Sequence, residues 1–205
     1  RTSRGILHEL YDGWHFVIHN RPVLNIMVLI AIFSLFGIPY LTFMPIFAED
    51  VLASGVTGLS LLISAAGIGS LVAAAWIAIN DSFSRKETFL AFSALVFASA
   101  ITILPFTKTL LPASIFMFVA GWGIVSFLAT ANSFVQHAVS DVLRGRVMGL
   151  YTLVFLGFAP LGNSIIGTLA QAIGTIFTLK LTGTICIISS VLFAHVFTRK
   201  TELLS

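Results

Sequence analysis

Charged side chains are scarce in this sequence, and their shortage limits the class of protein. Asp, Glu, Lys and Arg make up 9% of its 205 residues, and hydrophobic residues make up 58%. A typical soluble domain has about 25% charged and about 45–50% apolar residues. Residues 112–140 and 147–179 contain no charged side chain at all. Runs of this length and composition exclude a water-soluble domain that carries a single membrane anchor.

Regular alternation of polar and apolar residues is also missing, which argues against a membrane β-barrel. Barrel strands are segments of about ten residues that alternate in this way. The chain instead offers segments near the roughly 20 apolar residues that a helix needs to cross about 30 Å of hydrocarbon. We therefore predict an all-α, polytopic membrane protein with a six-helix bundle over residues 23–198. The predicted spans are 23–48, 56–79, 88–106, 111–137, 146–171 and 175–197.

Cysteine and catalytic motifs are nearly absent. Cys186 is the single cysteine, so an internal disulfide and a cysteine metal site are excluded. No H-E-x-x-H run or pair of aspartates occurs within a predicted span, as an intramembrane enzyme would need. His15 and His19 are four residues apart, but a metal site needs further ligands, so we interpret them as interfacial polar residues. We expect no catalytic site, no metal and no cofactor.

The few basic residues are unevenly placed. Threading six spans puts nine of the eleven Lys and Arg residues on one side of the membrane, and only Lys108 and Lys180 on or near the other. The nine are Arg1, Arg4, Arg21, Arg85, Lys86, Arg144, Arg146, Arg199 and Lys200. Such an excess marks the cytoplasmic side, so both termini are expected to be cytoplasmic. A nucleic-acid surface would gather these charges with reading elements, and their spread over alternate loops argues against that partner.

The segments outside the predicted bundle are short. Residues 5–19 combine a one-sided apolar face with interfacial aromatics such as Trp14, which predicts an amphipathic helix lying at the membrane surface. We interpret 1–22 as this helix and its linker, and 199–205 as a cytoplasmic tail. The sequence begins with Arg1 and not with Met. We interpret it as a piece of a longer protein or as a processed product.

Two prolines interrupt the first span. Pro39 and Pro45 each remove a backbone hydrogen bond and predict kinks, which makes both hinge candidates. Such breaks are tolerated in membranes where neighbouring helices or a cavity satisfy the freed carbonyl groups. Tyr40, between the prolines, is therefore a candidate for the wall of a substrate cavity. The alternative is that the bend only shapes the bundle.

Three other spans differ in their content of small residues and of the glycines and prolines that interrupt helices. The second span, 56–79, is full of small residues spaced for close helix contact, so we expect it to be buried in the bundle. The third span, 88–106, is rich in Phe, Leu and Ala and is expected to face lipid. The fifth span carries Gly157, Pro160 and Gly162 as further hinge candidates, and we predict that it is a moving, cavity-lining element.

Side-chain amides are the main polar groups at membrane depth. Asn132 and Gln136 lie one turn apart in the fourth span, and Asn163 lies in the middle of the fifth. Polar groups inside a membrane usually face the bundle interior or a water-filled cavity, so we take all three as candidates for a substrate cavity. The alternative is an interhelical hydrogen bond, which is worth about 0.6 kcal/mol on average.

A charged hairpin at 140–146 separates the fourth and fifth spans, and we expect it to be a short cytoplasmic loop. Its sequence continues as D-V-L-R-G-R-V-M-G-L-Y over 141–151 and is followed by G-F-A-P-L-G at 157–162. These motifs, with the preceding amides of the fourth span, resemble the region between the tenth and eleventh spans of major facilitator superfamily transporters. The likeness is greatest to the branch of drug and siderophore exporters that includes the enterobactin exporter.

Two further stretches resemble the same branch. Residues 13–22 are similar to its interfacial helix before the seventh span, and 40–48 are similar to the end of that span. The resemblance therefore covers essentially the whole chain, as the C-terminal half of a twelve-span protein. It implies that an N-terminal half of the same chain, or a second copy, completes the molecule in a bacterial inner membrane.

The resemblance also implies a function. Such proteins are secondary active transporters that work by alternating access, with a small-molecule substrate bound between two six-span halves in the lipid bilayer. By this likeness the chain is expected to export small amphiphilic molecules, drugs or siderophores. The alternative is a non-transporting remnant or accessory membrane protein of the same fold.

Charged residues at the cytoplasmic side are the candidates for a gate. In the hairpin these are Asp141, Arg144 and Arg146, although Ser140 occupies a position where the branch usually has proline. In the loop between the second and third spans, Asp81 and Arg85 match the superfamily's charged loop, whose glycines and first arginine are otherwise lost here. No Asp or Glu lies inside a predicted span, so a proton carrier would be in the other half or be a histidine.

Overall fold

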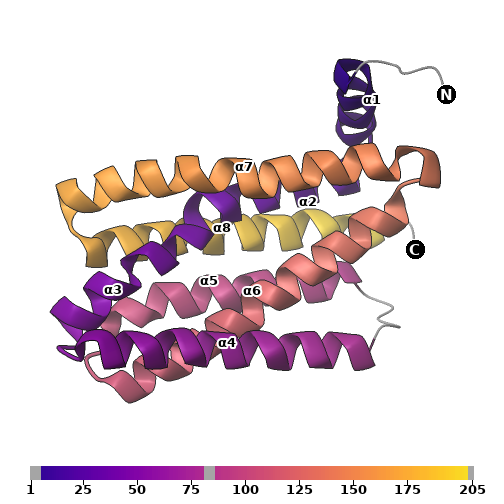
Figure 1. The fold of residues 1–205 in the computed structure, drawn as a ribbon. Coiled ribbons are helices and arrows are strands. Elements are labelled where there is room, and N and C mark those ends of the chain that lie inside the picture. Colours follow the sequence, from indigo (N-terminus) through magenta and orange to yellow (C-terminus); the bar gives the residue numbers. More distant parts are fainter. Residues whose placement is uncertain (1–5, 81–85, 203–205) are drawn as a thin grey trace.

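In a computed structural model, the chain forms a bundle of long helices that run side by side (Figure 1). The structure describes residues 6–80 and 86–202, with side chains described over 11–80 and 86–196, and no strand occurs in these ranges. The α-helices are α1 (Ile6–His19), α2 (Arg21–Ile32), α3 (Met44–Ile46), α4 (Gly55–Ile79), α5 (Lys86–Ile103), α6 (Leu110–Ala138), α7 (Asp141–Ile173) and α8 (Thr175–Glu202).

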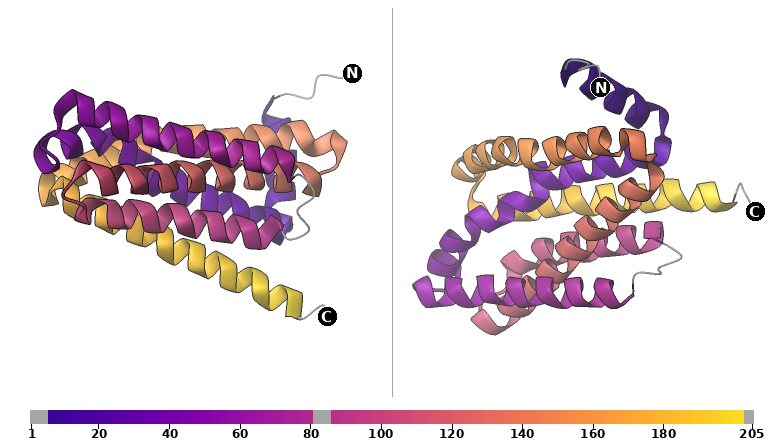
Figure 2. Two further views of the ribbon diagram at one scale, coloured as in Figure 1. Left: turned by 90° about the horizontal axis from the view of Figure 1, so that it is seen from below. Right: turned by 45° about the vertical axis from the view of Figure 1, so that its right-hand side comes forward.

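The described ranges contain six helical segments that are long and apolar enough to cross a membrane, as predicted. They are Arg21–Val51, Gly55–Ile79, Lys86–Phe106, Leu110–Ala138, Asp141–Ile173 and Thr175–Val196. An even number of crossings returns the chain to the side where it began, and the start of α2 and the end of α8 do lie at the same end of the bundle (Figure 1). Two further views show that the spans form one bundle and that α1 lies outside it (Figure 2). The all-α, polytopic membrane fold is confirmed.

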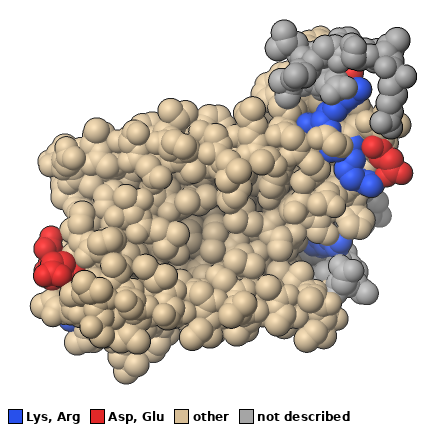
Figure 3. All heavy atoms as spheres, viewed as in Figure 1, with Lys and Arg blue, Asp and Glu red and all other residues tan. Residues whose placement is uncertain are grey.

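Charges gather at the two ends of the bundle and leave an uncharged middle (Figure 3). We call one end the basic end, because α2, α5 and α7 begin there with Arg21, Lys86 and the Arg144–Arg146 pair. The opposite end, called the far end, carries Glu49 and Asp50 at the close of the first span. An uncharged middle between two charged ends is the distribution that a bilayer requires.

The first span is not one helix but a series of short helical pieces. After α2 come a π-helical turn η1 (Phe33–Gly37), a 3-10 segment η2 (Ile38–Phe43), the short α3 and a second π-helical turn η3 (Phe47–Val51). Pro39 and Pro45 each fall at the second position of a new piece. Because proline lacks an N–H group and its ring clashes with the preceding turn, the regular hydrogen-bond pattern changes there. The predicted break is confirmed.

Burial differs from expectation in the second and third spans. The third span was expected to face lipid, yet 56% of its most apolar stretch is buried, because α5 lies between α6 and α8. The second span was expected to be buried, yet only 22% of the corresponding stretch of α4 is. The buried residues of α4 form one stripe: Gly58, Leu62, Ala66, Gly69 and Ala73. Both predictions were wrong, because composition does not specify which neighbours a helix has.

The charged hairpin is not a loop. Only Val139 and Ser140 separate α6 from α7, and Asp141 begins α7. Ser140 has extended backbone angles (φ −62°, ψ 153°), as a residue before a helix does, and Asp141 places a negative charge at the positive end of the helix dipole. Asp141 also pairs with Arg144 across one turn, at 2.7 Å. These local interactions extend the helix through the charges, so the predicted loop was wrong.

Candidate functional site

The contact between α7 and the first span brings together two segments with interrupted hydrogen bonding. At Gly162 the backbones approach so closely that a Cβ atom would lie 2.5 Å from the Leu35 carbonyl oxygen. Two hydrogen bonds flank this approach: the Ser34 hydroxyl donates to the Phe155 carbonyl (2.6 Å), and the Thr42 hydroxyl donates to the side-chain oxygen of Asn163 (3.1 Å). Gly162 thus permits a close, partly polar contact at membrane depth.

Pro160 lies within α7, between these two hydrogen bonds. It has no N–H group to donate to the Leu156 carbonyl, so α7 loses one helical hydrogen bond there. The facing π-helical and 3-10 segments are irregular in the same region. Irregular backbone inside a membrane is tolerated where it is packed against protein or lines a cavity. The hinge roles stay predictions for all five candidates: Pro39, Pro45, Gly157, Pro160 and Gly162.

Tyr40 and Thr42 lie two residues apart but face different surroundings. Tyr40 is only 5% exposed, and its ring contacts that of Phe97 in α5 edge to face, with 5.6 Å between centroids. In this conformation Tyr40 packs in the bundle interior, and its place in a cavity wall stays a prediction. Thr42 is exposed and reaches Asn163. Sequence reasoning missed Thr42, for which the only signal is its place between two prolines.

The three amides lie at two levels of the bundle. Gln136 donates to the Asn132 side-chain oxygen at 2.8 Å, and Asn132 lies six residues before the end of α6. Asn163 lies 22 residues after the start of α7. At 1.5 Å per residue these positions are about 9 Å and about 33 Å from the basic end. The structure therefore separates Asn163 from Asn132 and Gln136, and a role for each in a cavity stays a prediction.

Arg144 fastens the connection between α6 and α7. Its Nε donates to the Gln136 carbonyl at 3.3 Å, and its terminal nitrogen pairs with Asp141. The last carbonyl groups of a helix have no intrahelical partner, and a nearby cation satisfies them and complements the helix dipole. Arg144 therefore holds the start of α7 against the end of α6.

Arg146 joins α7 to α1. Its guanidinium group contacts the Asp12 carboxylate at 2.6 Å, and both side chains are about three-quarters buried. Gly13 lies directly beside this pair, since a Cβ there would be 3.3 Å from Arg146 and 3.2 Å from Leu150. α1 thus docks on the start of α7 and points away from the spans (Figure 1). The sequence did not predict this contact.

Comparison with known proteins shows which family this chain belongs to. A family model described as transmembrane secretion effector matches residues 2–204 of the chain. The chain belongs to this family. The secretion effectors are transporters of the major facilitator type, so the predicted resemblance is confirmed and a membrane transporter is favoured over an enzyme. No curated protein matches the sequence.

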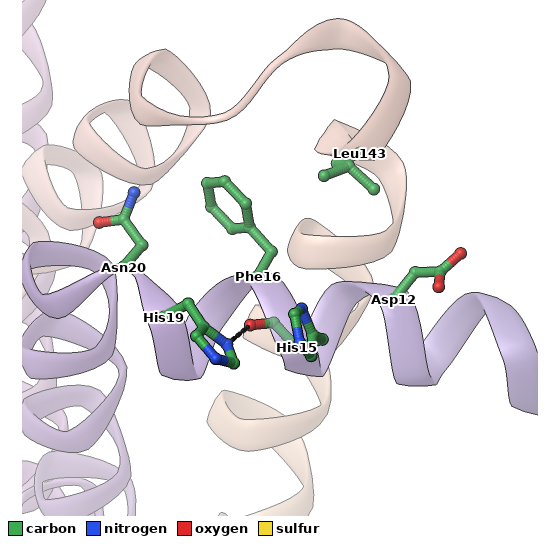
Figure 4. A pocket seen from close by; sticks show the side chains of 6 residues that line it. All are labelled: Asp12, His15, Phe16, His19, Asn20 and Leu143. Atoms are coloured by element: carbon green, nitrogen blue, oxygen red, sulfur yellow. Dashed lines mark hydrogen bonds between the residues drawn. The ribbon is translucent and has the colours of Figure 1, made fainter.

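A pocket of about 410 Å³ lies between α1 and the start of α7 (Figure 4). Phe16 of α1 and Leu143 of α7 line it from two sides, with His15 and His19 along α1. The two imidazole rings lie 4.1 Å apart, and His19 donates to the His15 carbonyl at 2.7 Å. Among the described residues, no group of three or more His, Cys, Asp or Glu side chains could hold a metal ion.

The other predicted gate residues, Asp81 and Arg85, lie outside the described residues. Lys86 follows them at the start of α5, and its ammonium group donates to the Ser133 hydroxyl of α6 at 3.1 Å. Ser133 is adjacent to Asn132. The basic end of α6 is therefore contacted by Lys86 from α5 and by Arg144 from α7.

Proposed function

We propose that this six-helix bundle is one half of a secondary active transporter that exports small amphiphilic molecules, such as drugs or siderophores, by alternating access. The observation that carries the proposal is the contact of α7 with the first span. Both segments have interrupted backbone hydrogen bonding at membrane depth, and both present polar side chains there. The first span is a broken helix, as are the helices that form the substrate sites of many secondary transporters, and Pro160 removes one hydrogen bond from the facing α7. The family description speaks of secretion, which supports outward transport.

The exposed side of α7 supports a second half as partner. Only 11% of its most apolar stretch is buried, and four of its glycines would meet nothing within 4 Å if they carried a Cβ. These are Gly145, Gly149, Gly157 and Gly167. Small residues let membrane helices approach closely. We propose that a second six-helix half, from the same polypeptide or a second copy, packs against this face while lipid covers the remaining apolar surface.

Charge placement supports one orientation. An excess of Lys and Arg marks the cytoplasmic side of a membrane protein. The basic end, with both described chain ends beside it, is therefore proposed to face the cytoplasm of a bacterial inner membrane. The pocket beside α1 then lies at the cytoplasmic surface, and Glu49 and Asp50 lie at the outer one.

The two levels of polar contacts support a gating mechanism. At the basic end, Arg144 and Arg146 hold the start of α7 to α6 and α1. About 27 Å further along α7, Thr42 and Asn163 join the first span to α7. The hydrocarbon core is about 30 Å thick, so these contacts lie on either side of its middle. We propose that inward opening loosens the contact of Arg146 with α1 while Arg144 keeps the start of α7 against α6, and that outward opening separates Thr42 from Asn163.

Efflux of a fluorescent cation such as ethidium tests the proposal. The native full-length protein is produced in a bacterial strain without its major drug exporters, and efflux is compared with an empty vector. We expect faster efflux with the protein, and an Asn163→Leu variant should slow it about fivefold, since one hydrogen bond is worth about 1 kcal/mol. Thr184→Val, which removes an exposed hydroxyl bonded only within α8, is the matched control. Efflux equal to the empty vector, repeated with a siderophore substrate, would favour an accessory protein.

A further inference from the structure

A groove between α2 and α8 lies apart from the contacts described above. It has a volume of about 260 Å³ and opens on the outer surface of the bundle. Val28 of α2 and Leu192 and Val196 of α8 line it, and each of these side chains is about half exposed. Asn25 and Ile32 are among the further residues that line it on α2. An apolar groove on the outer surface of a membrane bundle is in contact with lipid.

The α2 side of this groove changes in polarity along its length. Asn25, Val28 and Ile32 follow Arg21 by four, seven and eleven residues, so all four lie within about 60° of one another around the helix. Arg21 is the first residue of α2 and lies at the basic end, where a cation that begins a membrane span is expected to meet the lipid headgroups. From the basic end towards the middle of the bundle, this side of α2 therefore presents a cation, then an amide, then hydrocarbon side chains. Asn25 makes no side-chain hydrogen bond with the described part of the chain.

We propose that the α2–α8 groove binds one anionic phospholipid from the leaflet at the basic end. The Arg21 guanidinium group contacts the phosphate, since arginine matches phosphate oxygens with paired donors. The Asn25 amide donates to an ester carbonyl oxygen one turn deeper. An acyl chain then lies along Val28, Ile32 and Leu192. The groups of the groove therefore follow the order of the groups of a phospholipid.

Two features separate this site from ordinary lipid-exposed surface. The apolar surface of α7 around Leu153 and Leu161 is exposed to a similar extent, but the nearest arginine, Arg146, is already bonded to Asp12. The α2–α8 groove also has walls on two helices, so an acyl chain gains contacts on both sides. A cation near a membrane surface attracts anionic lipid with about 1 kcal/mol. We therefore expect the α2–α8 groove to select for lipid charge.

Photochemical labelling tests the proposal. The purified full-length protein is placed in phosphatidylcholine vesicles with a small fraction of phosphatidylglycerol that carries a diazirine in its acyl chain. We expect adducts concentrated on peptides of α2 and α8, and Arg21→Gln should reduce them about fivefold. Lys108→Gln removes one cation at the far end and should leave the labelling unchanged. Labelling spread evenly over α4, α7 and the groove would overturn the proposal.

Filling the groove provides a second measurement. Val28→Trp places a large side chain where the acyl chain is proposed to lie and should suppress labelling of α8. Leu153→Trp makes the same change on the open face of α7 and should not affect it. Gel filtration of both variants checks that they remain folded. If Val28→Trp does not fold, the labelling of the Arg21→Gln variant, which changes an exposed side chain, still tests the proposal. A phosphatidylcholine diazirine analogue that labels the groove as strongly as phosphatidylglycerol would also contradict the selection of an anionic lipid.

Discussion

Gly69 of α4 and Gly121 of α6 have surroundings opposite to those of Gly149 and Gly157 of α7. A Cβ at Gly69 would overlap the Phe118 backbone, and one at Gly121 would overlap the backbone of Ala66. The Ser70 hydroxyl crosses this interface to the Gly121 carbonyl at 3.2 Å. Along α7, by contrast, added Cβ atoms at Gly149 or Gly157 would meet nothing.

The comparison shows that glycine serves two purposes here. At the α4–α6 interface, glycines have no side chain to hold the two backbones apart, so these small residues make a helix contact within this bundle. At Gly145, Gly149, Gly157 and Gly167 of α7 they leave a face that no other described residue covers closely. A glycine-rich helix is therefore evidence of close contact, but the contact can lie inside the bundle or with another part of the assembly.

The largest effect is expected from filling the α4–α6 interface. Gly121→Val places three carbons against the Ala66 backbone, and overpacking of this kind costs about 1–3 kcal/mol or more. We expect a strong fall in abundance in the membrane and in the thermal unfolding temperature in detergent. Gly157→Val is the matched control and should change neither. Equal stability of the two variants would remove the distinction between the two sets of glycines.

The open face of α7 is expected to affect transport and not folding. Gly157→Leu should leave abundance and unfolding temperature unchanged but slow efflux about tenfold, if the added side chain costs about 1.4 kcal/mol of contact with the second half. Thr184→Leu adds bulk to an exposed position of α8 and should leave efflux intact. Normal efflux in Gly157→Leu would show that nothing packs closely on this face.

A third test concerns the contact of α7 with α1, the helix that lies outside the spans. Arg146→Gln removes the charge that pairs with Asp12, and a hydrogen bond between charged groups is worth about 1.5–3 kcal/mol. We expect the amides of α1 to exchange hydrogen at least about tenfold faster in mass spectrometry. Asp141→Asn is the control, because Asp141 is 86% exposed and its pair with Arg144 should contribute little. Unchanged exchange in Arg146→Gln would mean that apolar contacts alone hold α1.

The smallest effect is expected at two buried serines on the packed side. The Ser126 hydroxyl of α6 is buried without a hydrogen-bond partner in the described part of the chain, whereas Ser93 of α5 donates to the carbonyls of Phe89 and Leu90. Ser126→Ala should be neutral or stabilise by up to about 1 kcal/mol, and Ser93→Ala should destabilise by about 0.5–1 kcal/mol. Unfolding temperatures in detergent measure both. The opposite order would indicate that Ser126 has a partner in another conformation.

The features that could be predicted from the sequence are those set by local composition. The number of spans follows from apolar length, and the break at Pro39 and Pro45 follows from the missing N–H groups. The concentration of positive charge at one end follows from the spacing of Lys and Arg along the chain. Each of these depends on a single segment and the membrane, so no knowledge of neighbouring helices is needed.

The features that were missed depend on which segments meet. Asp12 and Arg146 are 134 residues apart in sequence, and nothing local marks them as a pair. The burial of α5 follows from its place between α6 and α8, and its composition resembles that of a lipid-facing helix. The three amides looked equivalent, but their distances from the basic end differ because α6 and α7 run in opposite directions. Tertiary contacts decided each case.

The two-residue connection between α6 and α7 limits how this bundle can change shape. Val139 and Ser140 span at most about 10 Å, so the two helix ends at that corner cannot part. The 33 residues of α7 extend about 50 Å from it. Rotation of α7 about this corner by about 10° would carry its other end through about 9 Å, with little displacement at Arg144. The corner is a pivot, and the widest excursions of α7 belong to the surface of the membrane opposite to it.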